Sequence, residues 1–187
     1  MERELNMRCP ESSDLRAGGF TVIEVIIVLA IASILMAIGM PSFQEFSRNM
    51  RAGSTMGALV NDIQLARSES VKRNTRVLFC ARATPASSAC AGAPIANTWM
   101  NGWIVCQDGD ANGNCDASTA ANPNPIRIQG ALAAPMALTG PAATLIVFPV
   151  GSASAGSVFT ITGGTNVTRT ATVAPSGSVV AARTEAY

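Results

Sequence analysis

The most distinctive pattern in the chain is a long apolar stretch near its N-terminus. From Val25 to Gln44 no charged residue occurs for twenty positions, and Leu, Ile, Val, Ala and Met predominate. A helix of about 20 apolar residues is long enough to span the hydrocarbon core of a bilayer. The pattern therefore predicts a transmembrane helix over residues 20–43, with one acidic residue, Glu24, close to its start.

A second helical pattern follows the apolar stretch. Apolar residues recur there at intervals of three and four, while most charged residues fall on other faces; the apolar positions are Met56, Leu59, Val60, Ile63 and Ala66. This periodicity predicts an amphipathic helix over residues 44–75, which lies on a sheet and ends at Asn74 and Thr75. Because Gly has a low helix propensity, we expect a bend or partial melting near Gly53 and Gly57.

The remaining residues, 76–187, have the pattern of a β-rich domain. Short β-branched runs alternate with clusters of Pro, Gly, Ala, Ser and Asn. The runs predict strands at Arg76–Ala81, Gly102–Gln107, Ile126–Gln129, Thr144–Val150, Val158–Thr162, Thr168–Ala174 and Ser178–Ala182, with a hairpin turn at Pro175-Ser176-Gly177. Aromatic residues are scarce, which favours a thin sheet on one helix. The predicted fold class is α+β, with a long N-terminal helix packed on a C-terminal antiparallel β region.

The composition offers little for catalysis. The chain has no His and few acidic residues, and it contains no Gly-x-Ser-x-Gly, Walker or paired-carboxylate arrangement. We therefore expect neither an enzyme nor an organic cofactor.

Cysteine usage indicates an oxidising compartment. Residues 20–187 hold four cysteines, an even number, and these allow three pairings: Cys80, Cys90, Cys106 and Cys115. The sequence-local pairing, Cys80 with Cys90 and Cys106 with Cys115, closes two short loops and is the one we expect. A zinc site is disfavoured because the chain has neither His nor a Cys-x-x-Cys spacing.

An Asp-rich segment, residues 108–116, has some features of a calcium loop. Oxygen-bearing residues alternate along it, with Gly at the sixth position; they are Asp108, Asp110, Asn112 and, further on, Asp116. The twelfth position is Thr119 instead of a bidentate Glu, and no flanking helices are predicted. A turn held by Asx side chains and Cys115 is the alternative.

Basic residues are concentrated between Arg48 and Arg82. This segment has seven Lys or Arg against two acidic residues. A nucleic-acid contact could use such a cluster, with Arg67, Lys72, Arg73, Arg76 and Arg82 as its members. A solvated or subunit-facing helix surface is the more common reason for such a pattern.

The start of the apolar stretch places a charge where lipid disfavours it. A carboxylate deep in lipid costs roughly 2.5–3.5 kcal/mol on insertion scales, so Glu24 needs a position near one face or a cationic partner. A cut between Gly19 and Phe20 would create an α-amine close to Glu24. In a packed assembly, the amine of one subunit could then neutralise Glu24 of the next.

The sequence Gly18-Gly19-Phe20-Thr21-Val22-Ile23-Glu24 and the apolar helix after it resemble the class III signal of type IV pilins and type II secretion pseudopilins. The resemblance implies that residues 1–19 are a leader. It implies that a prepilin peptidase cuts after Gly19 and methylates the Phe20 amine, and that Glu24 acts in assembly. Pro41 falls where this family usually kinks its N-terminal helix. The implied location is the inner membrane, crossed once, with a periplasmic domain that enters a filament.

The domain carries a second resemblance. Ala66–Asn74, the following strand that ends at Cys80, and the Trp99 and Asn101–Val105 segment ahead of the Asp-rich loop are similar to the GspH/FimT/FimU group of minor pilins and pseudopilins. This resemblance is firm from Gly18 to about Asp116. We expect Trp99 and Trp103 to be buried in the core.

Members of this group differ in their role. FimU-like members help to initiate or cap type IV pili, GspH-like members lie at the tip of the secretion pseudopilus, and FimT-like members bind DNA through a C-terminal Gly-Arg-x-Arg signature. The comparable turn here reads Ser176-Gly177-Ser178-Val179-Val180, with Arg183 later. The resemblance thus implies first a FimU-like minor pilin, with other minor pilins and the major pilin as partners. A DNA-binding minor pilin and a secretion pseudopilin are the alternatives.

Overall fold

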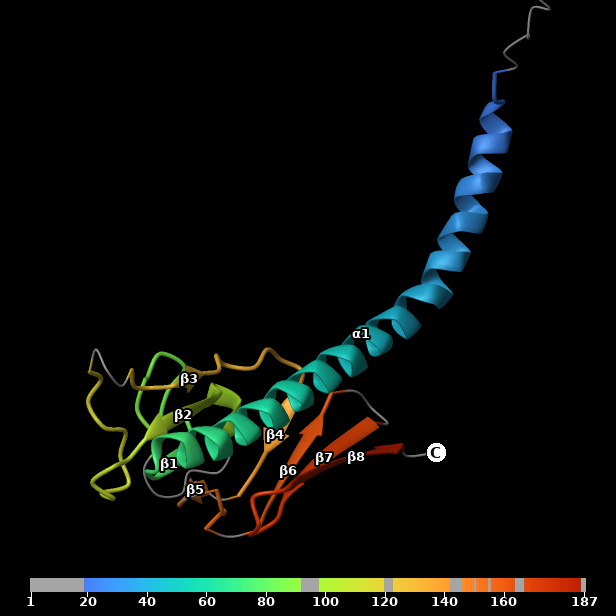
Figure 1. Cartoon of the computed structure of the whole chain (residues 1–187). Coiled ribbons are helices and arrows are strands. Elements are labelled where there is room, and N and C mark those ends of the chain that lie inside the picture. The colour runs from blue at the N-terminus through green and yellow to red at the C-terminus, as the bar shows by residue number, and fades with distance from the viewer. Residues whose placement is uncertain are drawn as a thin grey trace, which may run out of the picture. The chain divides into compact units, whose positions relative to one another are not determined.

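The structure is a computed structural model, and it describes residues 19–91, 98–119, 123–141, 146–149, 151–154, 156–163 and 167–185 (Figure 1). The chain divides into two compact units, Met1–Pro41 and Ser42–Tyr187. The second unit contains the strands and the C-terminal part of the helix.

Helix α1 (Val22–Arg73) covers both predicted helical segments without interruption. It ends where the sequence predicts, because Asn74 adopts a left-handed backbone with φ of 48° and the N–H groups of Asn74 and Thr75 bond back to the carbonyls of Val71 and Ser70. The helix stays continuous through Gly53 and Gly57, so the melting expected there was wrong. Burial of Ala52, Met56 and Leu59 on the same segment explains why two glycines do not break it.

The predicted antiparallel β region is confirmed, and it forms two four-stranded antiparallel sheets, a number that the sequence did not predict. The first sheet has the order β3-β2-β1-β5, with β1 (Val77–Ala81), β2 (Trp103–Gln107), β3 (Arg127–Ile128) and β5 (Ile146–Phe148). The second has the order β4-β6-β7-β8, with β4 (Ala137–Thr139), β6 (Ser157–Thr162), β7 (Val167–Val173) and β8 (Val179–Glu185). Figure 1 shows β6, β7 and β8 side by side, with β4 next to β6.

The strand predictions agree with the structure except at a few places. Strand β4 and the short 3-10 helix η1 (Thr98–Asn101) were missed, because neither has an alternating or helical apolar pattern. Strand β8 runs to Glu185, beyond the predicted end at Ala182. Of the strand predicted at 144–150, residues 144, 145 and 150 lie outside the described residues.

The main core lies between the second half of α1 and the two sheets. Its centre is an aromatic cluster in which the Trp99 and Phe159 rings pack edge to face at 4.8 Å and the Phe79 and Trp99 rings stack at 5.7 Å. Trp99 is 2% exposed and Trp103 is fully buried, which confirms the prediction for both. Leu59 and Ile63 bring the helix into the same core. Gly163 lies so close to Ala52 that a side chain at this glycine would overlap the Ala52 methyl group.

A second, smaller core covers the opposite face of β1 and β2. Side chains alternate along β1, so Phe79 enters the main core while Leu78 and Cys80 point to the other face. There they pack with Ile104 and Cys106 of β2. Strands β1 and β2 are therefore buried on both faces, and cysteine side chains form much of the second core.

Candidate assembly and processing site

The predicted cleavage site lies immediately before α1. Gly19 and Phe20 have no regular secondary structure, and the Phe20 side chain is 81% exposed. Thr21 caps the helix: its Oγ1 accepts a hydrogen bond from the N–H of Glu24 at 3.3 Å, and its carbonyl accepts one from the N–H of Val25 at 3.2 Å. A Thr followed by Glu three residues later is the sequence signature of a capping box. The Gly19–Phe20 bond thus lies outside the helix, where its backbone is accessible to a peptidase.

Glu24 occupies the first turn of α1, where the helix dipole favours a negative charge. With Phe20, Val25, Val28 and Leu29 it lines a shallow depression of about 220 Å³. The neighbouring side chains are apolar, so Glu24 is the one carboxylate in an otherwise apolar depression.

The first half of α1 presents its apolar side chains outward. Leu35 is 65% exposed and Ile38 is 70% exposed. Within the described residues, α1 alone is long and apolar enough to cross a membrane by length and composition, and its most apolar window is not buried against the rest of the chain. Pro41 lies inside this helix and has no N–H group, so it removes one hydrogen bond from the ladder.

Most cations of the predicted basic cluster have partners within the chain. Arg67 donates from Nε to the Gly151 carbonyl at 2.9 Å. Arg82 is 7% exposed and donates from Nε to the Ser87 carbonyl at 2.7 Å. Arg76 pairs through Nη2 with Oδ2 of buried Asp108 at 3.3 Å. Of these three arginines, only Arg76 is paired with a negative charge, since Arg67 and Arg82 donate to neutral carbonyls.

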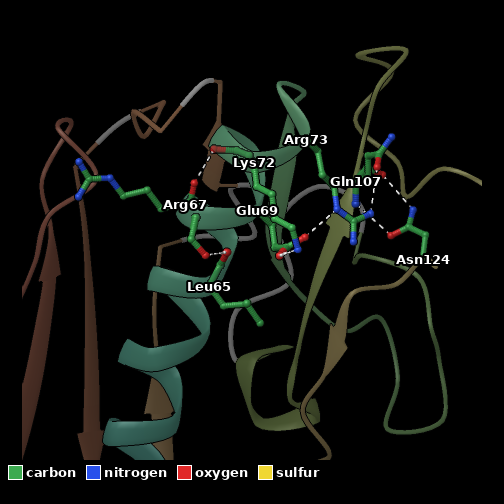
Figure 2. A network of polar contacts seen from close by, with 9 residues as sticks. Leu65, Arg67, Glu69, Lys72, Arg73, Gln107 and Asn124 are labelled. Carbon is green, nitrogen blue, oxygen red and sulfur yellow. Dashed lines mark hydrogen bonds and ion pairs between the residues drawn. The ribbon is translucent and has the colours of Figure 1, made fainter. Parts of the chain in front are cut away.

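The end of α1 is tied to β2 by a polar network (Figure 2). Arg73 donates from Nε to Glu69 Oε2 at 2.7 Å and from Nη1 to Gln107 Oε1 at 3.2 Å, while Asn124 holds both the N–H and the carbonyl of Gln107. The hydrogen bond from Arg73 holds the pKa of Glu69 below its usual value against the opposing effect of burial, with Lys72 adding to it. The Lys72 side chain is 75% exposed, more than those of Arg73 and Arg76.

The Asp-rich loop is organised by its own hydrogen bonds. Oxygens of Asp108, Asp110 and Asp116 lie within 4.8 Å of one another. Asp108 accepts bonds from the N–H groups of Asn112 and Gly113, and Asp116 accepts one from Gly109 at 2.8 Å. A calcium ion would compete with these donors and with the Arg76 guanidinium. The carboxylates bond the loop backbone as in an Asx-rich turn, and calcium binding by this loop stays a prediction.

The four cysteines form two disulfides, Cys80–Cys90 and Cys106–Cys115. This is the sequence-local pairing expected from the short loops. The two bonds lie next to each other, with 3.9 Å between the sulfurs of Cys90 and Cys115. Because Cys80 is on β1 and Cys106 is on β2, the two disulfides fasten the loops after these strands over the outer face of the first sheet.

Two buried polar residues of α1 were not singled out by the sequence. Asp62 Oδ2 accepts a hydrogen bond from the Trp103 indole at 2.8 Å. Ser70 Oγ accepts one from the N–H of Gly151 at 3.0 Å, and the same glycine bonds to Arg67. Both residues continue the three- and four-residue spacing of the buried helix face. This spacing is the signal from which their burial could have been predicted. Val60, which was placed on that face, is only partly buried.

Comparisons with known proteins bear on the whole domain. A family profile described as "Type II transport protein GspH" matches residues 55–177, which is more than half of the chain. The chain belongs to the GspH family. A second profile, described as "Prokaryotic N-terminal methylation motif", matches residues 15–40 and so includes Gly19, Phe20 and Glu24. GspH-family membership makes the chain a subunit of the minor pilin and pseudopilin type, a structural class.

Two solved structures similar to this GspH-family chain are crystal structures of the type IV minor pilin FimU from Pseudomonas aeruginosa (strain PAO1). One, in space group P21, has 15% identity and a TM-score of 0.48, and the match covers 72% of this chain and 90% of that one. The other, in space group P65, has 14% identity and a TM-score of 0.45, with 72% and 91% covered. A search of curated proteins returned no match.

Proposed function

We propose that this chain is a FimU-like minor pilin that enters or primes the tip of a type IV pilus. In this proposal the chain is inserted in the inner membrane by α1, with its domain on the periplasmic side. It is then cut between Gly19 and Phe20, and methylated on the Phe20 amine by a prepilin peptidase. Other minor pilins and the major pilin are its partners.

One arrangement carries the proposal: a capped helix start with Glu24 in its first turn, followed by a long exposed apolar helix. The charge-free surface suits lipid before assembly and other helices after it. Glu24 suits a role in registration, because an amine at Phe20 of a neighbouring subunit would neutralise it. The disulfide-closed domain suits an extracytoplasmic location.

A secretion pseudopilin is the second candidate, favoured by the description of the matching family profile. DNA binding is less well supported, because Arg67, Arg73, Arg76 and Arg82 are engaged by groups of the same chain.

The test follows the full chain in its own cells. Filaments are sheared from the surface, and the subunit is sought in them by mass spectrometry. A mature N-terminus at methylated Phe20 in the pilus fraction is the expected result. Recovery only in a strain with an active type II secretion system, with loss of secretion on deletion and pili unchanged, would favour the second candidate. A chain found uncut in cells with active peptidase would contradict both.

A further inference from the structure

The four disulfide-bonded sulfurs gather in one cluster over the outer face of β1 and β2. Cys90 Sγ lies 3.9 Å from Cys115 Sγ, although each is bonded to a different partner. The Sγ atoms of Cys80, Cys90 and Cys106 also lie within 4.8 Å of one another. Sulfurs of different disulfides are therefore near enough for one to attack the other after a small movement, which is what thiol–disulfide exchange needs.

The cluster has an inner and an outer pair of cysteines. Cys80 on β1 is 2% exposed and Cys106 on β2 is fully buried, whereas Cys90 and Cys115 are only partly buried. A disulfide is opened by a thiolate that reaches one of its sulfurs, so access decides which sulfur is attacked. A thiol from solvent therefore reaches the outer cysteines first. Each disulfide has one of them, and they are the two sulfurs that lie 3.9 Å apart.

Backbone hydrogen bonds also hold the outer cysteines in position. Next to Cys90, the N–H of Ala91 donates to the carbonyl of the last β1 residue at 2.8 Å. Next to Cys115, the N–H of Asp116 donates to the carbonyl of Gln107, the last residue of β2, at 2.9 Å. Neither bond involves a sulfur atom. We therefore expect both loops to keep their positions while one disulfide is open, with their outer sulfurs still side by side.

We propose that Cys90 and Cys115 form a shared exchange site, through which a thiol–disulfide oxidoreductase opens and closes both disulfides of the domain. A two-electron reduction by the dithiol of the oxidoreductase first opens Cys106–Cys115, and the oxidoreductase is left with a disulfide of its own. The Cys115 thiolate then attacks Cys90 Sγ. The Cys90–Cys115 bond forms, the Cys80–Cys90 bond breaks, and Cys80 leaves as a thiolate. This second step needs no oxidant, because the number of disulfides is unchanged.

The exchange gives the folded domain a route between cysteine pairings. Once Cys80 is released, its sulfur lies within 4.8 Å of Cys106 Sγ, so the inner pair is also within reach of each other. The oxidoreductase thus acts only on the accessible outer sulfurs, and the buried ones are changed by exchange inside the chain. The proposal concerns the domain alone and does not depend on which filament the chain enters.

The first experiment keeps only the outer pair, in the variant Cys80→Ser/Cys106→Ser of the full chain in detergent. The dilute protein is equilibrated with a glutathione redox buffer, and an intramolecular Cys90–Cys115 disulfide is the expected product in non-reducing peptide maps. The same variant in guanidinium is the control. There the two cysteines, 25 positions apart, meet only by chance, so the equilibrium constant for the bond should be at least about tenfold lower. Equal constants in the two states, or free thiols throughout, would overturn the proposal.

Single variants measure the exchange step itself and keep one disulfide for stability. Cys106→Ser leaves Cys115 free beside the Cys80–Cys90 bond. On incubation without oxidant, followed by acid quenching, unfolding and alkylation, part of the label should move from Cys115 to Cys80. Because the thiolate is the attacking species, exchange should slow by about tenfold or more between about pH 8 and about pH 6. Cys80→Ser is the matched variant, in which label should move from Cys90 to Cys106. Label that stays on the initially free cysteine in both variants would contradict the exchange.

A trapping experiment on the wild-type chain identifies the point of entry. A thioredoxin that lacks the second cysteine of its active site cannot release its substrate, so it stays joined to the sulfur that it attacks. Peptide mapping of the trapped complex should find it on Cys90 or Cys115. A complex on Cys80 or Cys106 would show that the buried sulfurs are attacked directly, and this would refute the assignment of the outer pair as the shared site.

Discussion

The indole Nε1 of Trp103 donates a hydrogen bond to Asp62 Oδ2 at 2.8 Å, joining β2 to α1 inside the core. Asp62 is 6% exposed, and its other oxygen, Oδ1, lies 3.5 Å from Arg127 Nε. A buried carboxylate is tolerated here because both oxygens have partners. The contact fixes which face of the helix meets the first sheet.

Replacing Asp62 should therefore destabilise the domain. We expect Asp62→Leu to lower the free energy of unfolding by about 1–3 kcal/mol, because the Trp103 N–H is left buried without an acceptor. Arg127→Ala, which removes the more exposed partner, should cost about 1 kcal/mol or less. Urea unfolding of the full chain in detergent, followed by Trp fluorescence, measures both. Equal losses in the two variants would contradict this ranking.

The two disulfides should contribute separately to stability. Replacing Cys80 and Cys90 together by Ser, or Cys106 and Cys115 together, should each cost about 2–3 kcal/mol, because each bond closes a short loop in the unfolded chain. The sequence separations are 10 and 9 residues. Denaturant titrations give the cost, and non-reducing peptide mapping of the wild type checks the pairing. Free thiols in the mature wild type would argue against the pairing and against an oxidising compartment.

Glu24 should be needed for assembly and not for cleavage. In Glu24→Ala the Gly19–Phe20 bond and the Thr21 cap are unchanged, so the peptidase should still cut. The carboxylate that would neutralise the Phe20 amine of a neighbouring subunit is lost, so the subunit should disappear from sheared filaments. Glu24→Gln is the matched control for shape and should show the same defect. Normal filament incorporation of both variants would show that the charge has no such role.

Glu69 should make stability depend on pH in the acidic range. Its folded-state pKa lies below the ordinary value of 4.5, chiefly because Arg73 bonds its carboxylate. The stabilisation is therefore present above pH 4.5 and is lost as the pH falls through the lower, folded-state pKa. Glu69→Gln should cost about 1 kcal/mol or less at pH 7, and the difference from wild type should shrink toward pH 3. A difference that grows on acidification would refute the assignment.

DNA binding by the basic residues near the end of α1 should be weak. We expect the full chain in detergent to bind duplex DNA with a dissociation constant in the millimolar range or weaker at about 0.15 M salt. The reason is that Arg73 and Arg76 are engaged within the domain. Fluorescence anisotropy over a salt series measures this. Submicromolar binding that Arg73→Ala and Arg76→Ala abolish would reverse the conclusion.

Local periodicity was enough to predict α1, its end at Asn74 and most strands, because these depend on neighbouring residues. The arrangement of the strands in two sheets was not predictable in this way. Strand β4 has one buried residue, Leu138, and depends on its pairing with β6. The number of sheets could not be predicted because alternation in a strand does not show which sheet the strand joins.

The site residues also divide into those that are contiguous in sequence and those that only the fold brings together. The cleavage motif and the short cysteine loops are contiguous in sequence, so they could be recognised directly. The partners of the cations could not, because Arg67 meets Gly151 and Arg169 meets the helix near Asn49 only through the fold. A count of basic residues therefore could not show that Arg76 is paired with Asp108 and Arg73 with Glu69.

The Thr21 cap has a consequence for the order of events in maturation. The first turn of α1 is closed by a side chain that lies after the proposed cut, so the leader contributes none of the hydrogen bonds described for that turn. Removing the leader would change the charge in front of the helix and would leave the Thr21 cap in place. The proposed cut would therefore alter the charge in front of a helix whose described first-turn hydrogen bonds are already made, and it would not require those bonds to change.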